Sequence, residues 1–183
     1  MPAAEFRHDQ PDRCVVGTVG DPGQRTFYLQ ARTGDVLTSV VLEKTQVAAL
    51  ADRMEELLDS VVRRTGGQAS VPAATPTTVD DLGPLDIPLE EEFRVGTLAM
   101  AWLGEQERLE VIATAVPVDP EQQTPEDELD VLTVALTGAQ ARAFVSRARA
   151  VVSAGRPHCP LCSQPLDPAG HVCPRQNGFH RRG

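Results

Sequence analysis

The same order of strand-like and helix-like segments occurs twice in this chain of 183 residues, and this repetition constrains its fold most strongly. In the first half, three segments rich in β-branched residues are separated by glycine-containing turns and followed by an apolar stripe of helical period. The second half has the same order. The predicted strands are 12–20, 24–32, 36–42, 93–103, 108–118 and 131–136, and the predicted helices contain the apolar stripes 47–61 and 141–152.

Individual residues also recur at equivalent places in the two halves, and chance similarity of two β-rich segments is the alternative explanation. Residues 16–19 (VGTV) match 95–98 (VGTL), residues 35–38 (DVLT) match 130–133, and Gln46 and Arg53 match Gln140 and Arg147. We therefore predict an α+β fold in which two β-β-β-α repeats form an antiparallel sheet with two helices, with strands pairing or helices packing about a pseudo-two-fold axis.

The predicted boundaries follow from this repetition. The first repeat is 1–66 and the second is 92–155. The linker 67–91 is rich in Pro, Ala, Thr and Asp and is expected to be loop or partly disordered, and an acidic insertion at 119–130 interrupts the second repeat. Residues 156–183 form a separate tail.

Charge and hydropathy exclude several classes of function. The chain has 26 acidic and 17 basic residues, a formal net charge of −9, which disfavours general binding to nucleic acid or membrane surfaces. It has no apolar run of 18 residues and no visible signal peptide, so we expect a cytoplasmic protein without a membrane span. Cysteines in that compartment stay reduced.

Three of the four cysteines lie in the tail, at a spacing typical of a zinc knuckle. Cys159 and Cys162 form a C-x2-C pair, and Cys173 follows after a loop with two prolines and a glycine. The tail has few apolar residues, so a metal ion could provide the stability that a core cannot. A flexible tail with free thiols is the alternative, and a redox pair lacks its usual βαβ setting.

The fourth ligand is expected to be a histidine. We predict His171, which gives C-x2-C-x8-H-x-C; His180 and His158 are the competitors, but His158 directly precedes Cys159. Four protein ligands leave no open position, so Zn2+ bound by Cys159, Cys162, His171 and Cys173 would be structural.

The rest of the sequence contains no recognisable catalytic set. Cys14 lies in a predicted strand and is expected to be a buried small hydrophobic residue, and His8, near a terminus, is expected to be exposed. The carboxylates at 90–92 and 121–130 are interpreted as solvated loops.

The chain resembles an uncharacterised actinobacterial family of conserved proteins. The segments that carry the resemblance are VVGTVGDPGQRTFYLQAR, VVLEKTQVAAL, EEEFRVGTLAMAW, LTGAQARAF and GRPHCPLCSQPLDPAGHVCPRQNGF. The resemblance implies a cytoplasmic protein without an established catalytic residue, often encoded near a histidine-phosphatase-like phosphomutase and a kinase-like protein. It also supports the ligand set that includes His171.

A looser resemblance links the strands to PUR repeats, which bind single-stranded nucleic acid. Arg25, Phe27 and Tyr28 on one strand are similar to the basic and aromatic face that stacks on bases, but the second half lacks it.

Three functions therefore compete. The first is a non-catalytic interaction or adaptor protein, for which the neighbour-encoded phosphatase-like or kinase-like protein is a candidate partner. The second is an enzyme or accessory subunit that acts on a phosphorylated metabolite, which requires a pocket of converging His, Arg and carboxylates between the repeats. The third is the PUR-like binder of nucleic acid.

Overall fold

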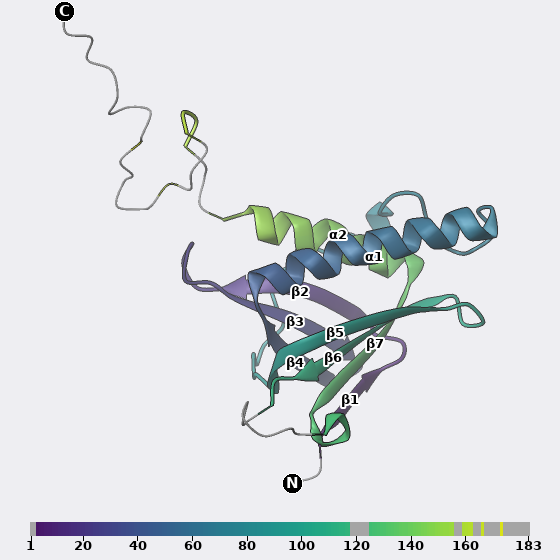
Figure 1. Cartoon of the computed structure of the whole chain (residues 1–183), viewed down its shortest axis with the longest axis horizontal. Helices are drawn as coiled ribbons and strands as arrows, with labels where there is room; N and C mark the ends of the chain where they lie inside the picture. Colours follow the sequence, from purple (N-terminus) through teal and green to yellow (C-terminus); the bar gives the residue numbers. More distant parts are fainter. Residues whose placement is uncertain (1–2, 118–124, 156–158, 163–165, 167–172, 174–183) are drawn as a thin grey trace, which may run out of the picture.

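The computed structural model describes residues 3–117, 125–155, 159–162, 166 and 173. The described part contains a single seven-stranded sheet in the order β1-β7-β6-β5-β4-β3-β2, with two helices on one of its faces (Figure 1). The elements are β1 (Glu5–His8), β2 (Arg13–Val19), β3 (Thr26–Thr33), β4 (Val36–Leu42), α1 (Lys44–Thr65), β5 (Phe93–Leu103), β6 (Arg108–Ala115), β7 (Val131–Thr137) and α2 (Gly138–Ser153), with short 3-10 turns at η1 (Thr77–Val79) and η2 (Glu126–Glu128). The predicted α+β class with two helices is confirmed.

The sheet is mixed, so the prediction that it would be antiparallel needs correction. Strands within each half are antiparallel, but β4 pairs in parallel with β5, and β1 pairs in parallel with β7. Strand β1 was missed in the sequence because four residues are too few to establish an alternating pattern.

The connection between β1 and β2 forces the sheet to curl. These strands are at opposite edges, yet only residues 9–12 join them, and such a connection spans at most about 18 Å. A flat sheet of this size would separate its edges by about 29 Å. The edges therefore approach one another, and His8 on β1 comes within hydrogen-bond distance of Thr33 on β3 and Thr38 on β4.

The core lies between the helices and the sheet face that they cover. Both helices direct an apolar stripe into this layer, as predicted from their periodicity. Helix α1 buries Val47, Leu50, Ala51, Met54, Leu58 and Val61, and α2 buries Ala141, Phe144, Val145 and Ala148 among others.

The third residue of each helix is a glutamine that accepts a hydrogen bond from the residue before the helix. Gln46 Oε1 accepts from the Glu43 N–H at 2.8 Å, and Gln140 Oε1 accepts from the Thr137 N–H at 3.0 Å. Thr137 Oγ1 accepts in return from the Gln140 N–H, which confirms the capping box predicted there. Helix α1 ends at Gly66, whose φ of 60° suits a residue without a Cβ.

The segment 67–91 is mostly irregular, as expected, but part of it is held firmly against the first half. Gln30 on β3 donates to the Asp86 carbonyl and accepts from the Asp86 N–H at 2.7 Å. Just after the segment, the Glu92 N–H donates to the Ser39 carbonyl at 2.9 Å. The segment thus covers the face of β3 and β4 that points away from the helices, where Gln30 and Ser39 are buried.

No helix in the described part of the chain combines the length and the apolar character needed to cross a membrane.

Candidate metal centre

The three cysteines of the tail come together in the structure. The sulfur atoms of Cys159, Cys162 and Cys173 all lie within 4.8 Å of one another. Cys159 and Cys173 are buried, with exposed fractions of 5% and 3%, and Cys162 is half-buried. Such a group of donors on a tail with little core of its own is typical of a metal clip.

The spacing of the sulfur atoms fits a metal ion better than a disulfide. Cys159 Sγ and Cys173 Sγ are 3.8 Å apart. Two thiolates on a tetrahedral zinc ion, each at about 2.3 Å, would be roughly 3.8 Å apart, whereas bonded sulfurs are about 2.05 Å apart. All four cysteines of the chain are described, and none is in a disulfide. The donor set therefore fits a tetrahedral ion that accepts thiolate ligands.

Local sequence explains how the first two ligands meet. Residues 160–162 form a turn, which brings Cys162 back toward Cys159. Cys173 lies beside this pair although it is eleven positions after Cys162 in the sequence. The predicted fourth ligand, His171, and its competitors His158 and His180 lie outside the described residues, so the choice among them stays a prediction.

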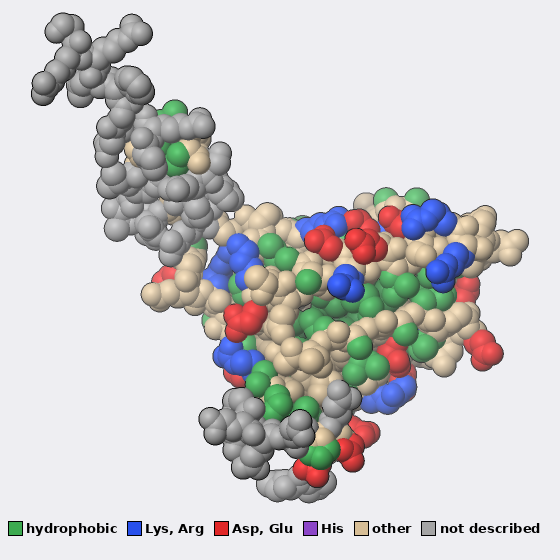
Figure 2. All heavy atoms as spheres, viewed as in Figure 1, with side chains coloured by type: hydrophobic (Ala, Val, Ile, Leu, Met, Phe, Trp, Pro, Cys, Tyr) green, Lys and Arg blue, Asp and Glu red, His purple; other side chains and the backbone are tan. Residues whose placement is uncertain are grey.

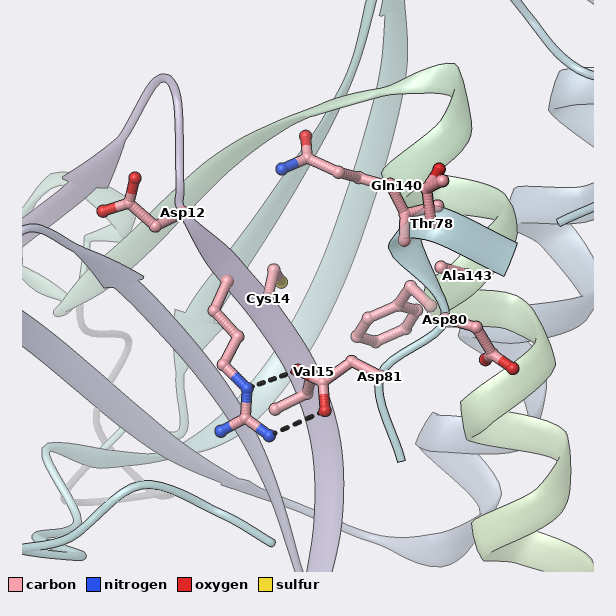
Figure 3. Close-up of a pocket in the computed structure, with 11 residues that line it drawn as sticks. Asp12, Cys14, Val15, Thr78, Asp80, Asp81, Gln140 and Ala143 are labelled. Carbon is pink, nitrogen blue, oxygen red and sulfur yellow. Dashed lines mark hydrogen bonds and ion pairs between the residues drawn. The ribbon is translucent and has the colours of Figure 1, made fainter. Parts of the chain in front are cut away.

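The sheet and the two helices form the body of the protein, and its two halves correspond to the predicted repeats 1–66 and 92–155. A second candidate site is a pocket of about 240 Å3 between these two halves (Figure 3). Three separate segments form its walls: the start of β2, the segment around η1, and the first turns of α2. The lining residues are Asp12, Arg13, Cys14, Val15, Thr78, Val79, Asp80, Asp81, Gln140, Ala143 and Phe144. The pocket has arginine and carboxylates, but no histidine of the described chain lines it.

The cysteine in this pocket is not activated as a nucleophile. Burial raises the pKa of the Cys14 thiol to about 12, so it is protonated at neutral pH. Cys14 packs against the core as the expected small hydrophobic residue, but it is half-buried rather than buried.

The charged groups beside this pocket are bound to each other. Arg13 donates to Asp81 through Nε and also forms an ion pair with Asp86 at 3.0 Å. The hydrogen bond from Arg13 is the main reason that the pKa of Asp81 is lowered, and the Gly83 N–H contributes. An arginine and a carboxylate that neutralise each other are poorly suited to acid–base chemistry.

Arg147 extends this cluster, and sequence analysis did not predict its role. From α2 it donates to the carbonyls of Val16, Asp81 and Gly83, with the Val16 bond at 2.6 Å and the Gly83 bond at 2.7 Å. Its side chain is only 8% exposed. The cluster thus fixes the segment 80–86 over the outer edge of β2.

The expectation that His8 is exposed is wrong. His8 is only 1% exposed, because the curled sheet places β1 next to β3 and β4. Its Nδ1 lies 2.7 Å from Thr33 Oγ1 and its Nε2 lies 2.9 Å from Thr38 Oγ1. Burial lowers its pKa.

The aromatic residue proposed for base stacking is also placed differently from the PUR-like hypothesis. Phe27 is 5% exposed and belongs to the core, so its ring is not available to a base. Its outer side is covered by Arg25, whose guanidinium lies 5.8 Å from the ring centre.

One family comparison gives a match. The family described as "Protein of unknown function (DUF3090)" matches residues 6–173, which include both halves of the body and the three clustered cysteines. No curated protein and no solved structure matches the chain.

Proposed function

The chain belongs to the DUF3090 family, and we propose that it is a zinc-binding interaction protein. In this proposal Cys159, Cys162, His171 and Cys173 hold one structural Zn2+, and the body is a non-catalytic adaptor for a protein partner.

The distance between buried sulfur atoms carries the proposal. Cys159 Sγ and Cys173 Sγ are 3.8 Å apart with Cys162 Sγ close to both, which is the spacing of thiolates on one tetrahedral ion. Three thiolates and one imidazole are a common ligand set for structural zinc. With all positions taken by protein, the ion supplies stability to the tail and leaves no site for an attacking water.

The state of the pocket in the body supports a non-catalytic role. Its thiol is protonated, and Arg13 is bound to Asp81 and Asp86. A general base or an activated nucleophile would need a group with a pKa near the working pH. The pocket between the halves therefore favours an adaptor over an enzyme that acts on a phosphorylated metabolite.

Metal analysis of the full chain tests the zinc site. We expect about one zinc per chain after purification without added metal, and loss of most of it in Cys159→Ser and Cys173→Ser. Cys14→Ser is the matched control, because it removes a thiol outside the cluster, and it should keep its zinc. His171→Ala and His180→Ala decide between the two histidines.

Zinc below about one tenth of an equivalent in the wild-type chain, or equal zinc in Cys173→Ser and Cys14→Ser, would contradict the site. If the purified chain contains iron and absorbs visible light, the cysteines hold a thiolate-bound metal other than zinc.

A second experiment tests the adaptor role. The neighbour-encoded phosphatase-like and kinase-like proteins are purified and mixed with the full chain and with the Cys159→Ser/Cys173→Ser variant. A role of the zinc tail in docking predicts co-elution with the wild type and weaker co-elution with the variant. No complex with either protein would count against these partners.

A further inference from the structure

We infer that a hollow at the junction of the two halves, lined by Arg25, Lys44 and Arg94, binds the phosphate group of a small ligand. This site is separate from both the cysteine cluster and the pocket beside Cys14.

The three cations come from different elements that meet where β4 pairs with β5. Arg25 immediately precedes β3, Lys44 is the first residue of α1, and Arg94 lies on β5 opposite Val41. They line a hollow of about 140 Å3 together with Thr26, Phe27, Val41, Leu42 and Glu43. Near the start of α1, basic side chains lie on either side of an acidic one (Figure 2).

Two of these cations have no acidic partner in the described part of the chain. Arg94 pairs with Glu43 at 3.0 Å, but Arg25 and Lys44 form no ion pair with a described carboxylate. Most buried or half-buried arginines of the described chain do pair: Arg13, Arg32, Arg142 and Arg147 each contact an aspartate. Exposed cations such as Arg53, Arg63 and Arg64 also lack an ion pair with a described carboxylate, so what distinguishes Arg25 and Lys44 is that they line one hollow.

The unpaired cations also converge. A Cβ built on Gly155 would lie 3.5 Å from both Arg25 Nη2 and Lys44 Nζ, so the two charged groups lie close together. Like charges at short range repel each other. The carboxyl end of α2, just before Gly155, offers only a partial negative charge in compensation. An anion between them would remove the repulsion.

The position of Arg25 is fixed by an aromatic ring. Its guanidinium lies 5.8 Å from the centre of the Phe27 ring, within the range of a cation–π contact. A guanidinium held in this way keeps a planar fork of donors, which suits the oxygens of a phosphate.

Size and charge select the class of ligand. The hollow is smaller than the ~300 Å3 at which sites for drug-sized ligands begin, so it suits a single phosphate group. A phosphate monoester has about −1.5 to −2 charges at pH 7, against three cations and one carboxylate in the hollow. The net charge of −9 opposes a long polyanion such as nucleic acid.

Titration calorimetry of the full chain with inorganic phosphate and pyrophosphate tests the inference, with chloride keeping the ionic strength constant. We expect one saturable site, and binding about fivefold to tenfold weaker in Arg25→Ala and in Lys44→Ala, as for loss of one charge-assisted contact. Arg63→Ala, which removes an exposed cation at the other end of α1, should bind as the wild type does.

One variant should act in the opposite direction. Among the described residues that line the hollow, Glu43 is the only carboxylate, so Glu43→Gln removes that charge and frees Arg94, and phosphate should bind more tightly. A merely structural role of the cations does not produce this gain.

Lys44 offers a second readout because it is the sole lysine of the chain. Phosphate should slow acylation of Lys44 by an amine reagent, as measured by mass spectrometry, while the N-terminal amine serves as the internal reference. The inference is overturned if phosphate binding is not saturable, if Arg63→Ala weakens it as much as Lys44→Ala, or if Glu43→Gln fails to tighten it.

Discussion

The two halves of the body use the same glutamine in the same way. Gln46 Oε1 accepts from the residue before α1, and its Nε2 donates to the Val95 carbonyl on β5 at 3.1 Å. Gln140 Oε1 accepts from the residue before α2, and its Nε2 donates to the Pro11 carbonyl just before β2 at 2.8 Å. Each glutamine thus links the start of its own helix to the backbone of the other half, as expected if the predicted repeat is correct.

The halves differ at the arginine that follows each glutamine by seven residues. Arg53 on α1 is exposed, whereas Arg147 on α2 is buried and donates to three backbone carbonyls. The cause is the position of the strands: β2 is at an edge of the sheet, so its outward carbonyls need a partner, whereas β5 is central. Equivalent residues acquire different roles when only one strand has a free edge.

The largest expected effect is at this arginine pair. Arg147→Ala leaves the carbonyls of Val16, Asp81 and Gly83 without their donor, and should lower the free energy of unfolding by about 3–5 kcal/mol. Arg53→Ala should change it by less than about 0.5 kcal/mol. Urea denaturation of both variants measures the difference, and equal losses would remove the contrast between the halves.

Next in size is the contact of the segment 80–86 with β2. A Cβ on Gly17 would lie 2.7 Å from Leu85 Cγ, so Gly17→Ala should cost about 1–3 kcal/mol of unfolding free energy. Adding Leu85→Ala should make the Gly17→Ala change less costly. The equivalent Gly96 faces the backbone of Ala115 and Val116 instead, so Leu85→Ala should not alter the cost of Gly96→Ala. Double-mutant cycles measure the coupling of Leu85→Ala with Gly17→Ala and with Gly96→Ala. Equal coupling energies in the two cycles would contradict the placement of the segment 80–86 against β2 alone.

The two glutamines should behave alike. Gln46→Ala and Gln140→Ala each remove a helix cap and one link to the other half, and each should cost about 1–2 kcal/mol. Thermal or urea unfolding is sufficient to compare them. If one variant loses almost no unfolding free energy and the other loses the full ~1–2 kcal/mol, the two glutamines do not have equivalent roles.

The smallest effect concerns His8, which has no counterpart in the second half. Because burial lowers its folded-state pKa, the unfolded chain binds a proton near pH 6.5 while the folded chain does not. The contribution of His8 is therefore fully present above pH 6.5 and decreases as the pH falls toward the lowered pKa. The urea midpoints of wild type and His8→Gln are measured between pH 8 and 5. The midpoint should fall less steeply with decreasing pH in the variant than in the wild type. Parallel curves would show that other groups cause the pH dependence.

Much of the fold was predictable from local patterns. The six strands and two helices expected from periodicity are all present, because alternation and the helical stripe are properties of neighbouring residues. The cysteine cluster was predictable for the same reason: the C-x2-C spacing places two thiols on one turn. For the fourth ligand the sequence favours His171 over His180, and both lie outside the described residues, so this stays a prediction.

What the sequence by itself determined is which segments form strands and helices, and which side chains are suited to hold a metal. Only the tertiary structure decided that the sheet curls, that its halves join in parallel, and that His8 is buried. It also decided that Arg147 meets Asp81, which lies 66 residues away, and that Arg25 and Lys44 converge beside Gly155. The physical reason is that hydrophobic periodicity and ligand spacing are properties of residues close together in the sequence. The partners of a buried charge or of a sheet edge come from segments far apart in the sequence, which meet only when the chain folds.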